Sequence, residues 1–436
     1  MPYDIILGRD SADKQKFGKN GLIYIGKGYV KMGNYTSLSN KIYMDVARTH
    51  VVLVAGKRGS GKSYTLGVIA EELSNLQQET SQNIASIIFD TMGIFWTMKF
   101  KNEKDLSLLN SWDLKSKNLP IKVFVPIGKA EEYKEKNIPV DETFSIKPSE
   151  LEAEDWISLF NLNITSLEST LIQRTIKELK EKVGQFSLLE MKVLSEHDKK
   201  ANQNTKEILS SLILAADDWG IFSKDEKGTE ISDLVIPGTT TILDTSVYST
   251  TQAYNIRALV ISLISKKIFK SRMDARKKEE INLIKSGNDY LTSNIKKEDP
   301  LVWIFIDEAH EFLPKDSVTP ATETLKQILR EGRQPGISLV LATQQPGEIH
   351  KDAMTQSDIV ISHRVTSKPD IEALNNIMQT YLLENIQNQM NDLPQLKGSA
   401  IILDDNSERL YPIRIRPRFT WHGGEAPTAV GTEIKI

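Results

Sequence analysis

The 436-residue sequence contains no cysteine, and this absence excludes several classes of site at once. Disulfide bonds, thiol catalysis, iron–sulfur clusters and cysteine-bound zinc all need the missing thiol. The six histidines include no pair at the His-x-x-x-His spacing of helical zinc sites, so a dedicated zinc site is not expected. A chain without cysteine suits a reducing compartment, and we predict a cytoplasmic protein.

Long apolar segments and an excess of one charge are also missing. The longest purely apolar runs, such as 301–306, have the length of a strand, so no membrane-spanning helix and no membrane partner are expected. The first residues lack the basic and apolar segments of a signal peptide. Because 55 Lys and Arg face 58 Asp and Glu, any contact with DNA must come from a local patch or a channel.

Strand-length and helix-length patterns alternate along most of the chain. We predict apolar strands at 51–55, 84–90, 121–125, 239–243, 301–306, 338–342 and 359–362, and helices at 62–76, 251–269 and 321–330. The alternation predicts an α/β fold in which helices cover both faces of a parallel sheet.

We expect three parts in the chain. Residues 1–45 contain short strands and turns, which predict a small, barrel-like N-terminal β subdomain. Residues 46–408 form the α/β core, and 409–436 form a C-terminal strand and tail. Within the core, 147–222 combine helical spacing of apolar residues with many charges, which predicts a helical insertion.

The strongest motif is Gly-Lys-Arg-Gly-Ser-Gly-Lys-Ser at 56–63, between a predicted buried strand and a predicted helix. This is the phosphate-binding loop pattern in the context that it requires, because its glycines let backbone N–H groups converge on phosphates at a helix N-terminus. Lys62 would neutralise the β- and γ-phosphates, and Ser63 would ligate Mg²⁺. The residues expected to contact the nucleotide are Gly56, Arg58, Gly59, Ser60, Gly61, Lys62, Ser63 and Tyr64.

A second motif follows the apolar strand 301–306, which ends in two adjacent carboxylates. At the C-terminal end of a parallel strand, Asp307 would meet Mg²⁺ beside the phosphate loop. Glu308 would orient and deprotonate the attacking water. Such a pair is weak evidence alone, but together with the upstream loop it predicts a nucleoside triphosphatase.

Two further groups are candidates for the same chemistry. Arg333 follows a helix end at Gly332, and on a subunit surface it could reach a neighbour's γ-phosphate as an arginine finger. A solvated arginine at a helix C-terminus is an equal alternative, and Arg330 is a weaker candidate. Gln344 follows the strand 338–342 at the edge that carries Asp307, where it could sense the γ-phosphate or place the water, and a plain amide at a strand end is the alternative.

Two basic stretches could contact a nucleic-acid backbone or a neighbouring subunit. In 413–418 the isoleucines are expected to face inwards and Arg414, Arg416 and Arg418 outwards, although a solvated strand face fits equally well. The run of basic residues between Lys266 and Lys278 fits a solvated helix end better than a surface that tracks DNA.

Together, these motifs resemble the HerA/FtsK superfamily, and most closely its HerA-type ATPases. The stretches 56–63, 301–310, 330–333 and 343–345 occur in the order and spacing of that family. Supporting similarities are 87–90 with Gly93, 242–244 with the following helix, and 416–424, so that the resemblance spans 46–424. Thr91-Met92 departs from the family's Asp-Pro turn, and the β region before the phosphate loop is shorter than the family's barrel.

The resemblance implies a RecA-like P-loop ATPase core, assembled into a ring that is usually a hexamer. Such a ring hydrolyses ATP between subunits and moves duplex DNA through a central channel. Carried over to this sequence, Lys62 and Ser63 hold nucleotide and Mg²⁺, Asp307 binds the metal and Glu308 is the base. Gln344 becomes the sensor, and Arg333 becomes the finger that acts in trans.

The resemblance also implies a partner, either a NurA-like nuclease in DNA end processing and repair or another effector, such as a sirtuin-type protein, in anti-phage defence. Other interpretations stay open. They are an ATP-binding ring that serves as a scaffold for an effector, a conjugation or genome-packaging ATPase, and a DEAH-type helicase. The last would need a second RecA-like domain, for which too few residues follow His310.

Overall fold

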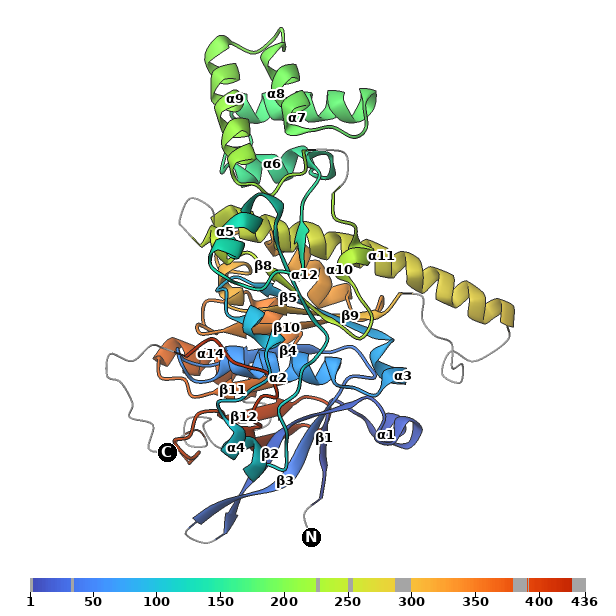
Figure 1. The fold of residues 1–436 in the computed structure, drawn as a ribbon, viewed down its shortest axis with the longest axis vertical. Coiled ribbons are helices and arrows are strands. Elements are labelled where there is room, and N and C mark those ends of the chain that lie inside the picture. Colours follow the sequence, from blue (N-terminus) through green and yellow to red (C-terminus); the bar gives the residue numbers. More distant parts are fainter. Residues whose placement is uncertain are drawn as a thin grey trace.

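The structure is a computed structural model that describes residues 3–32, 35–224, 228–249, 254–286, 299–378, 390 and 392–425. The described strands form one sheet of 13 strands in the order β1-β3-β2-β13-β12-β11-β4-β10-β9-β5-β8-β6-β7. Helices lie on both sides of the central part of this sheet (Figure 1). The predicted α/β fold with a parallel, helix-covered sheet is therefore confirmed.

Eight neighbouring strands run parallel and form the centre of the sheet. They are β11 (Ile359–His363), β4 (Val51–Ala55), β10 (Ile337–Thr343), β9 (Leu301–Ile306), β5 (Ile84–Asp90), β8 (Thr240–Asp244), β6 (Ile121–Pro126) and β7 (Glu142–Phe144). The seven apolar strands that the sequence predicts between 51 and 362 are all among them. The short strand β7 was not predicted, because three residues carry no periodic signal.

Side chains of the central strands alternate between two hydrophobic cores, as a pleated sheet with two covered faces requires. In β4, Leu53 and Ala55 join the core that includes α11 (Tyr254–Ser286) and α12 (Thr322–Glu331). Val52 and Val54 join the core that includes α2 (Lys62–Ser74). The phosphate-loop strand is thus buried on both sides.

The sheet continues beyond β11 with antiparallel strands. These are β12 (Ser399–Asp404), β13 (Arg409–Ile415), β2 (Leu22–Met32) and β3 (Tyr35–Asp45), and β1 (Ile5–Leu7) then pairs with β3 in parallel. Strand β2 is therefore paired with residues of β13 that lie 385 to 389 positions further along the chain, and the N-terminal strands belong to the same sheet as the core. The domain boundaries proposed from the sequence stay a prediction.

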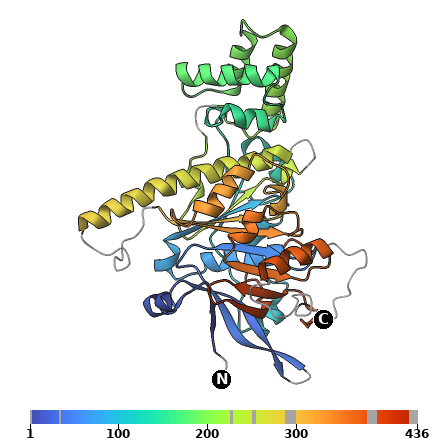
Figure 2. The ribbon, with the colours of Figure 1, turned by 180° about the vertical axis from the view of Figure 1, so that it is seen from behind.

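A group of helices projects from the C-terminal side of β7 and stands apart from the sheet (Figures 1 and 2). It consists of α6 (Ala153–Leu159), α7 (Leu167–Lys182), α8 (Leu188–Glu196) and α9 (Gln203–Asp218). Ser166, Ser187 and Asn202 cap α7, α8 and α9 through side-chain oxygens, so local sequence starts each of these helices.

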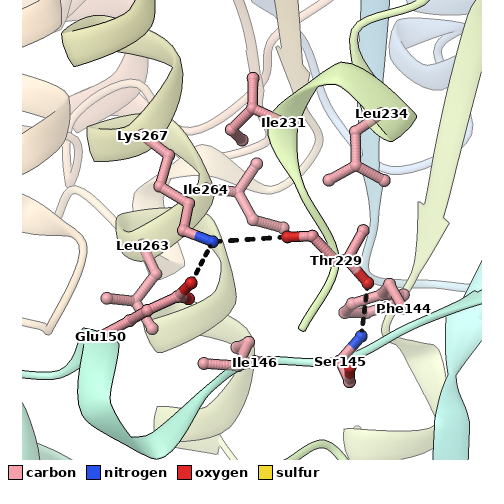
Figure 3. Close-up of a pocket in the computed structure, with 10 residues that line it drawn as sticks. All are labelled: Phe144, Ser145, Ile146, Glu150, Thr229, Ile231, Leu234, Leu263, Ile264 and Lys267. Atoms are coloured by element: carbon pink, nitrogen blue, oxygen red, sulfur yellow. Dashed lines mark hydrogen bonds and ion pairs between the residues drawn. The ribbon is translucent and has the colours of Figure 1, made fainter. Parts of the chain in front are cut away.

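The base of this helical group is fastened to α11 (Figure 3). The ammonium of Lys267 lies 2.7 Å from Glu150 and donates to the carbonyl of Thr229 at 3.4 Å. The neighbouring Lys266 pairs with Asp155 of α6 at 3.0 Å. Two lysines from the predicted solvated run therefore hold the helical group against the core.

Helix α11 is longer than predicted and extends 17 residues beyond Phe269, to Ser286. Its start in the prediction, 251–253, lies outside the described residues. Arg272, which the sequence placed on a solvated helix end, is only 2% exposed and donates to the carbonyls of Pro335 and Asp299 at 2.8 and 2.7 Å. No helix in the described part of the chain is long and apolar enough to cross a lipid bilayer.

The remaining helices are short. They are α1 (Ser11–Phe17), α3 (Gln78–Ser81), α4 (Leu106–Ser111), α5 (Ala130–Glu135), α10 (Ile231–Leu234), α13 (Lys351–Thr355) and α14 (Lys368–Met378).

The prediction for Arg416 and Arg418 was wrong, because both side chains are fully buried. Strand β13 ends at Ile415, so the alternation that placed them outside does not continue. The chain instead turns over α2, where Arg416 lies 2.7 Å from Glu71 and 3.0 Å from Glu72. Glu71 also accepts hydrogen bonds from the backbone N–H groups of Phe419 and Thr420. We call residues 416–420 the tail clamp.

Candidate nucleotide site

The phosphate loop runs from the end of β4 to the start of α2, as predicted from its motif. Gly59 and Gly61 have φ of 72° and 116°, in the region that glycine alone adopts without strain. Lys57 and Arg58 are exposed, whereas Lys62 is 6% exposed and its ammonium lies 3.4 Å from the carbonyl of Lys57. The loop therefore curves back towards its own backbone, and the Lys62 side chain is enclosed by it.

Two neighbouring strands fasten this loop at its base. The N–H of Gly56 donates to the carbonyl of Thr343 on β10 at 3.2 Å. The N–H of Lys57 donates to the carbonyl of Arg364, just after β11, at 2.9 Å. Backbone hydrogen bonds to the two segments that flank β4 in the sheet thus fix the position at which the loop begins.

The structure brings Ser63 and Asp307 together. The Ser63 hydroxyl donates to Asp307 Oδ2 at 2.5 Å, although 244 residues separate the two. Asp307 is 1% exposed at the C-terminal end of β9, and burial raises its carboxyl pKa against the opposing effects of the Ser63 hydroxyl and Lys62. A half-buried hydroxyl in contact with a buried carboxylate supplies the hard oxygen ligands that Mg²⁺ prefers, so these two residues fit the metal.

Glu308 follows with φ 50° and ψ 44°, a left-handed backbone that is uncommon for a non-glycine residue. Burial, and then the charge of Asp307, raise the pKa of its carboxyl to about 7. Its Oε2 atom is buried, lies 3.6 Å from His310 Nδ1, and has no hydrogen-bond partner within the described residues. A carboxylate with a free oxygen and a raised pKa is suited to accept a proton from water.

Strand β10 lies between β4 and β9, so its end faces the space between the phosphate loop and the carboxylates. Gln344 directly follows this strand and is half-buried. Its neighbour Thr343 lies 3.2 Å from His310 Nδ1 and accepts a hydrogen bond from the N–H of Gln345. The predicted sensor is thus at the same edge as Asp307, and Thr343 links it to the loop that carries Glu308.

The structure places Arg333 at the opposite edge of the sheet. It is exposed and precedes β10, whose seven residues span about 23 Å. Arg333 therefore cannot reach the phosphate loop of its own chain. The carbonyl of Arg333 accepts from Thr49 at 3.4 Å, and Arg272 holds Pro335, so the loop is anchored. Arg330 is instead engaged with Asp352 at 2.7 Å.

No sequence pattern pointed to His363, the last residue of β11, which is fully buried next to the phosphate loop. The role of Asp90 was not predicted either. Its carboxylate accepts hydrogen bonds from the backbone N–H groups of residues 92–95 at 2.7 to 3.2 Å. Thr91-Met92 therefore occupies a carboxylate-capped turn although it departs from the family's Asp-Pro.

These observations define a P-loop ATPase of the RecA-like class, in which β10 separates the phosphate-loop strand from the strand that ends in the acidic pair. The family model described as the central domain of the helicase HerA matches residues 27–268, more than half of the chain. The chain therefore belongs to the HerA helicase family of the HerA/FtsK superfamily, as its motifs indicated.

Individual relatives are distant. The DNA double-strand break repair helicase HerA of Sulfurisphaera tokodaii is 23% identical over 384 residues, which cover 84% of this chain and 64% of that protein. HerA of Pyrococcus furiosus is 25% identical over 182 residues, 38% of this chain and 31% of that protein. The aligned parts thus span less than two thirds of either relative.

Solved structures show the same fold at low identity. VirB4 of Thermoanaerobacter pseudethanolicus superimposes with a TM-score of 0.56 and 13% identity, over 95% of this chain and 98% of that chain. The conjugative coupling protein TrwBdeltaN70 in complex with sulphate gives a TM-score of 0.50 and 12% identity, over 86% of this chain and 87% of that chain. Both comparisons support the fold assignment.

Proposed function

We propose that this chain is an ATP-driven DNA translocase of the HerA type, which hydrolyses ATP with Mg²⁺ at the interfaces of a ring. The observation that carries the proposal is the contact between Ser63 and Asp307 at 2.5 Å, beside the buried Lys62 and the Glu308 oxygen that makes no hydrogen bond within the described parts of the chain. The phosphate loop, the two oxygens proposed to bind Mg²⁺ and the proposed base thus lie at one edge of the sheet.

The residues of one chain would perform most of the reaction. Backbone N–H groups of 59–63 and the ammonium of Lys62 would bind the phosphates, and Gln344 would orient a water towards the γ-phosphate. Glu308 would accept the proton from that water. Mg²⁺, held by Ser63 and Asp307, would neutralise charge on the β- and γ-phosphates.

The position of Arg333 supports the proposed ring. Its exposed side chain lies at the edge remote from its own phosphate loop, on a loop anchored by Arg272 and Thr49. A guanidinium in this position can complete a site only in a neighbouring subunit, which is how a trans finger acts. Hexameric assembly, duplex DNA in the channel, and a nuclease or other effector as partner are proposed from the family.

The test is the steady-state ATPase rate of the purified chain with and without linear duplex DNA, beside a Glu308→Gln variant. Stimulation by DNA that disappears in the variant is expected. Hydrolysis that DNA does not change would contradict translocation and favour a scaffold or a motor that waits for its partner. Because phosphate contacts dominate such binding, the stimulation should weaken steeply as salt increases and depend little on sequence.

A further inference from the structure

Besides the residues that would touch the nucleotide, one buried histidine lies against the phosphate loop. His363 ends β11, which pairs in parallel with β4 so that Ser362 lies opposite Ala55. His363 therefore sits beside Gly56, the first residue of the loop, and it is fully buried. The mechanism proposed above assigns it no task.

The imidazole occupies the space directly beneath the loop. A Cβ atom added to Gly56 would lie 2.7 Å from the Cβ of His363, closer than carbon atoms approach. A Cβ atom added to Gly61 would lie 3.5 Å from Cε1 of the same ring, in ordinary contact. The histidine thus touches the loop near both of its ends.

Both ring nitrogens are used. His363 Nδ1 lies 3.1 Å from the carbonyl oxygen of Ser399 on β12, so Nδ1 carries the hydrogen and donates. Nε2 of the neutral ring is then an acceptor for the hydroxyl of Thr65, in the first turn of α2, at 2.8 Å, and the same hydroxyl also lies 3.0 Å from the carbonyl oxygen of Gly61. This is the neutral tautomer, and it agrees with burial and Lys62, which lower the pKa of His363 to about 4. The ring joins β12 to α2 across the underside of the loop.

We propose that His363 is a positioning residue. Its neutral imidazole packs against the phosphate loop and holds α2 in the position in which the backbone N–H groups of the loop face the phosphates. The inference rests on the proposed nucleotide binding. It adds that the site needs β11 and β12 in addition to the strands that carry the motifs.

The experiment compares His363→Ala and His363→Gln with the wild type, using a non-hydrolysable ATP analogue. Loss of both hydrogen bonds of the ring and of its packing against the loop should raise the Kd of the analogue about tenfold in His363→Ala. The KM for ATP should rise with it, while kcat stays within about twofold, since positioning the loop acts on binding. His363→Gln returns an amide oxygen near the place of Nε2 and should regain much of the affinity.

A matched control is available in the same pair of strands. His50 precedes β4 and is equally buried, but it bridges Asp45 and Asp358 at the opposite ends of β4 and β11. His50→Ala should lower the melting temperature and leave the Kd within about twofold of the wild type.

Each outcome is decisive. An unchanged Kd in His363→Ala, or an equal loss of affinity in His50→Ala, would overturn the positioning role. If His363→Ala does not fold, Thr65→Val removes the hydroxyl at the other end of the contact and should raise the Kd about threefold, and no change there would overturn the role as well. A wild-type chain that binds no analogue would overturn the proposed function together with this inference, whereas the first two results would leave nucleotide binding intact.

Discussion

The guanidinium of Arg416 and the carboxylate of Glu71 form a fully buried ion pair at 2.7 Å, although 345 residues separate them in the sequence. Glu71 belongs to the helix that begins at the phosphate loop, and Arg416 belongs to the tail clamp. Phe419 lies over the same guanidinium at 3.9 Å. The clamp therefore holds the phosphate-loop helix at Glu71 and also in its first turn, where the Tyr64 hydroxyl accepts a hydrogen bond from the N–H of Arg418 at 2.7 Å.

The first prediction concerns this pair. Glu71→Gln leaves the buried guanidinium of Arg416 with Glu72 as its remaining carboxylate partner, and it should lower the free energy of unfolding by about 3 kcal/mol in urea titrations. The exposed pair of Glu131 and Lys134 is the control, because Glu131→Gln should cost at most about 0.5 kcal/mol. A loss in Glu71→Gln no larger than in the control would show that the buried pair does not stabilise the fold.

The second prediction uses a glycine in the same helix. Gly→Ala inside a helix ordinarily stabilises by about 0.5–1 kcal/mol. At Gly67, however, the new Cβ would lie 2.5 Å from a guanidinium nitrogen of Arg418. We expect Gly67→Ala to destabilise by about 1–3 kcal/mol in urea titrations. In an Arg418→Ala background the same substitution should become neutral or stabilising, and failure to change sign would contradict the contact.

The third prediction separates nucleotide binding from hydrolysis. Lys62→Ala removes the positive charge in the loop and should abolish nucleotide binding, as measured by titration with a labelled ATP analogue. Arg333→Ala should keep that binding but reduce the hydrolysis rate by about a thousandfold or more, since the finger stabilises only the transition state.

Two measurements check the trans assignment of Arg333. Arg330→Ala is the matched control, because Arg330 pairs with Asp352 and should affect turnover far less. Rings that mix Arg333→Ala with Lys62→Ala subunits should recover some activity, since a subunit with an intact loop can then meet a neighbour with an intact finger. Normal turnover in pure Arg333→Ala protein would refute the assignment.

The fourth prediction follows from His50. Burial alone would lower the pKa of this imidazole, but Asp358 and Asp45 outweigh burial and raise the pKa to about 9. Because the folded value lies above the unfolded value of about 6.5, this stabilisation is complete below pH 6.5 and disappears as pH rises through 9. Urea titrations should show a loss of up to about 3 kcal/mol over that range. In His50→Asn this part of the pH dependence should be absent.

The sequence was sufficient for the central fold because its strongest signals are local. Apolar runs such as 301–306 and the loop 56–63 form recognisable patterns within a few residues, and their order predicts a parallel sheet. The spatial closeness of Ser63 and Asp307 follows, since loops after parallel strands meet at one edge.

What the sequence could not supply are contacts between distant segments. The alternation in 413–418 suggested exposed arginines. No local pattern indicates that the strand ends at Ile415, or that Glu71 and Glu72 on a distant helix are the partners of Arg416. Arg272 was misplaced for the same reason, since its partners are backbone carbonyls 27 and 63 residues away. A lone His363 carries no pattern, and only the pairing of β11 with β4 places it under the loop.

The tail clamp has a consequence for the order of events during synthesis. The phosphate loop leaves the ribosome more than 350 residues before Arg416, and contacts between such distant segments form slowly. Until the clamp is translated, Glu71 has neither its guanidinium nor the backbone donors of Phe419 and Thr420. A nascent chain that has not reached residue 416 thus carries a phosphate-loop helix without these contacts. They form only after β13 and the tail clamp have been translated.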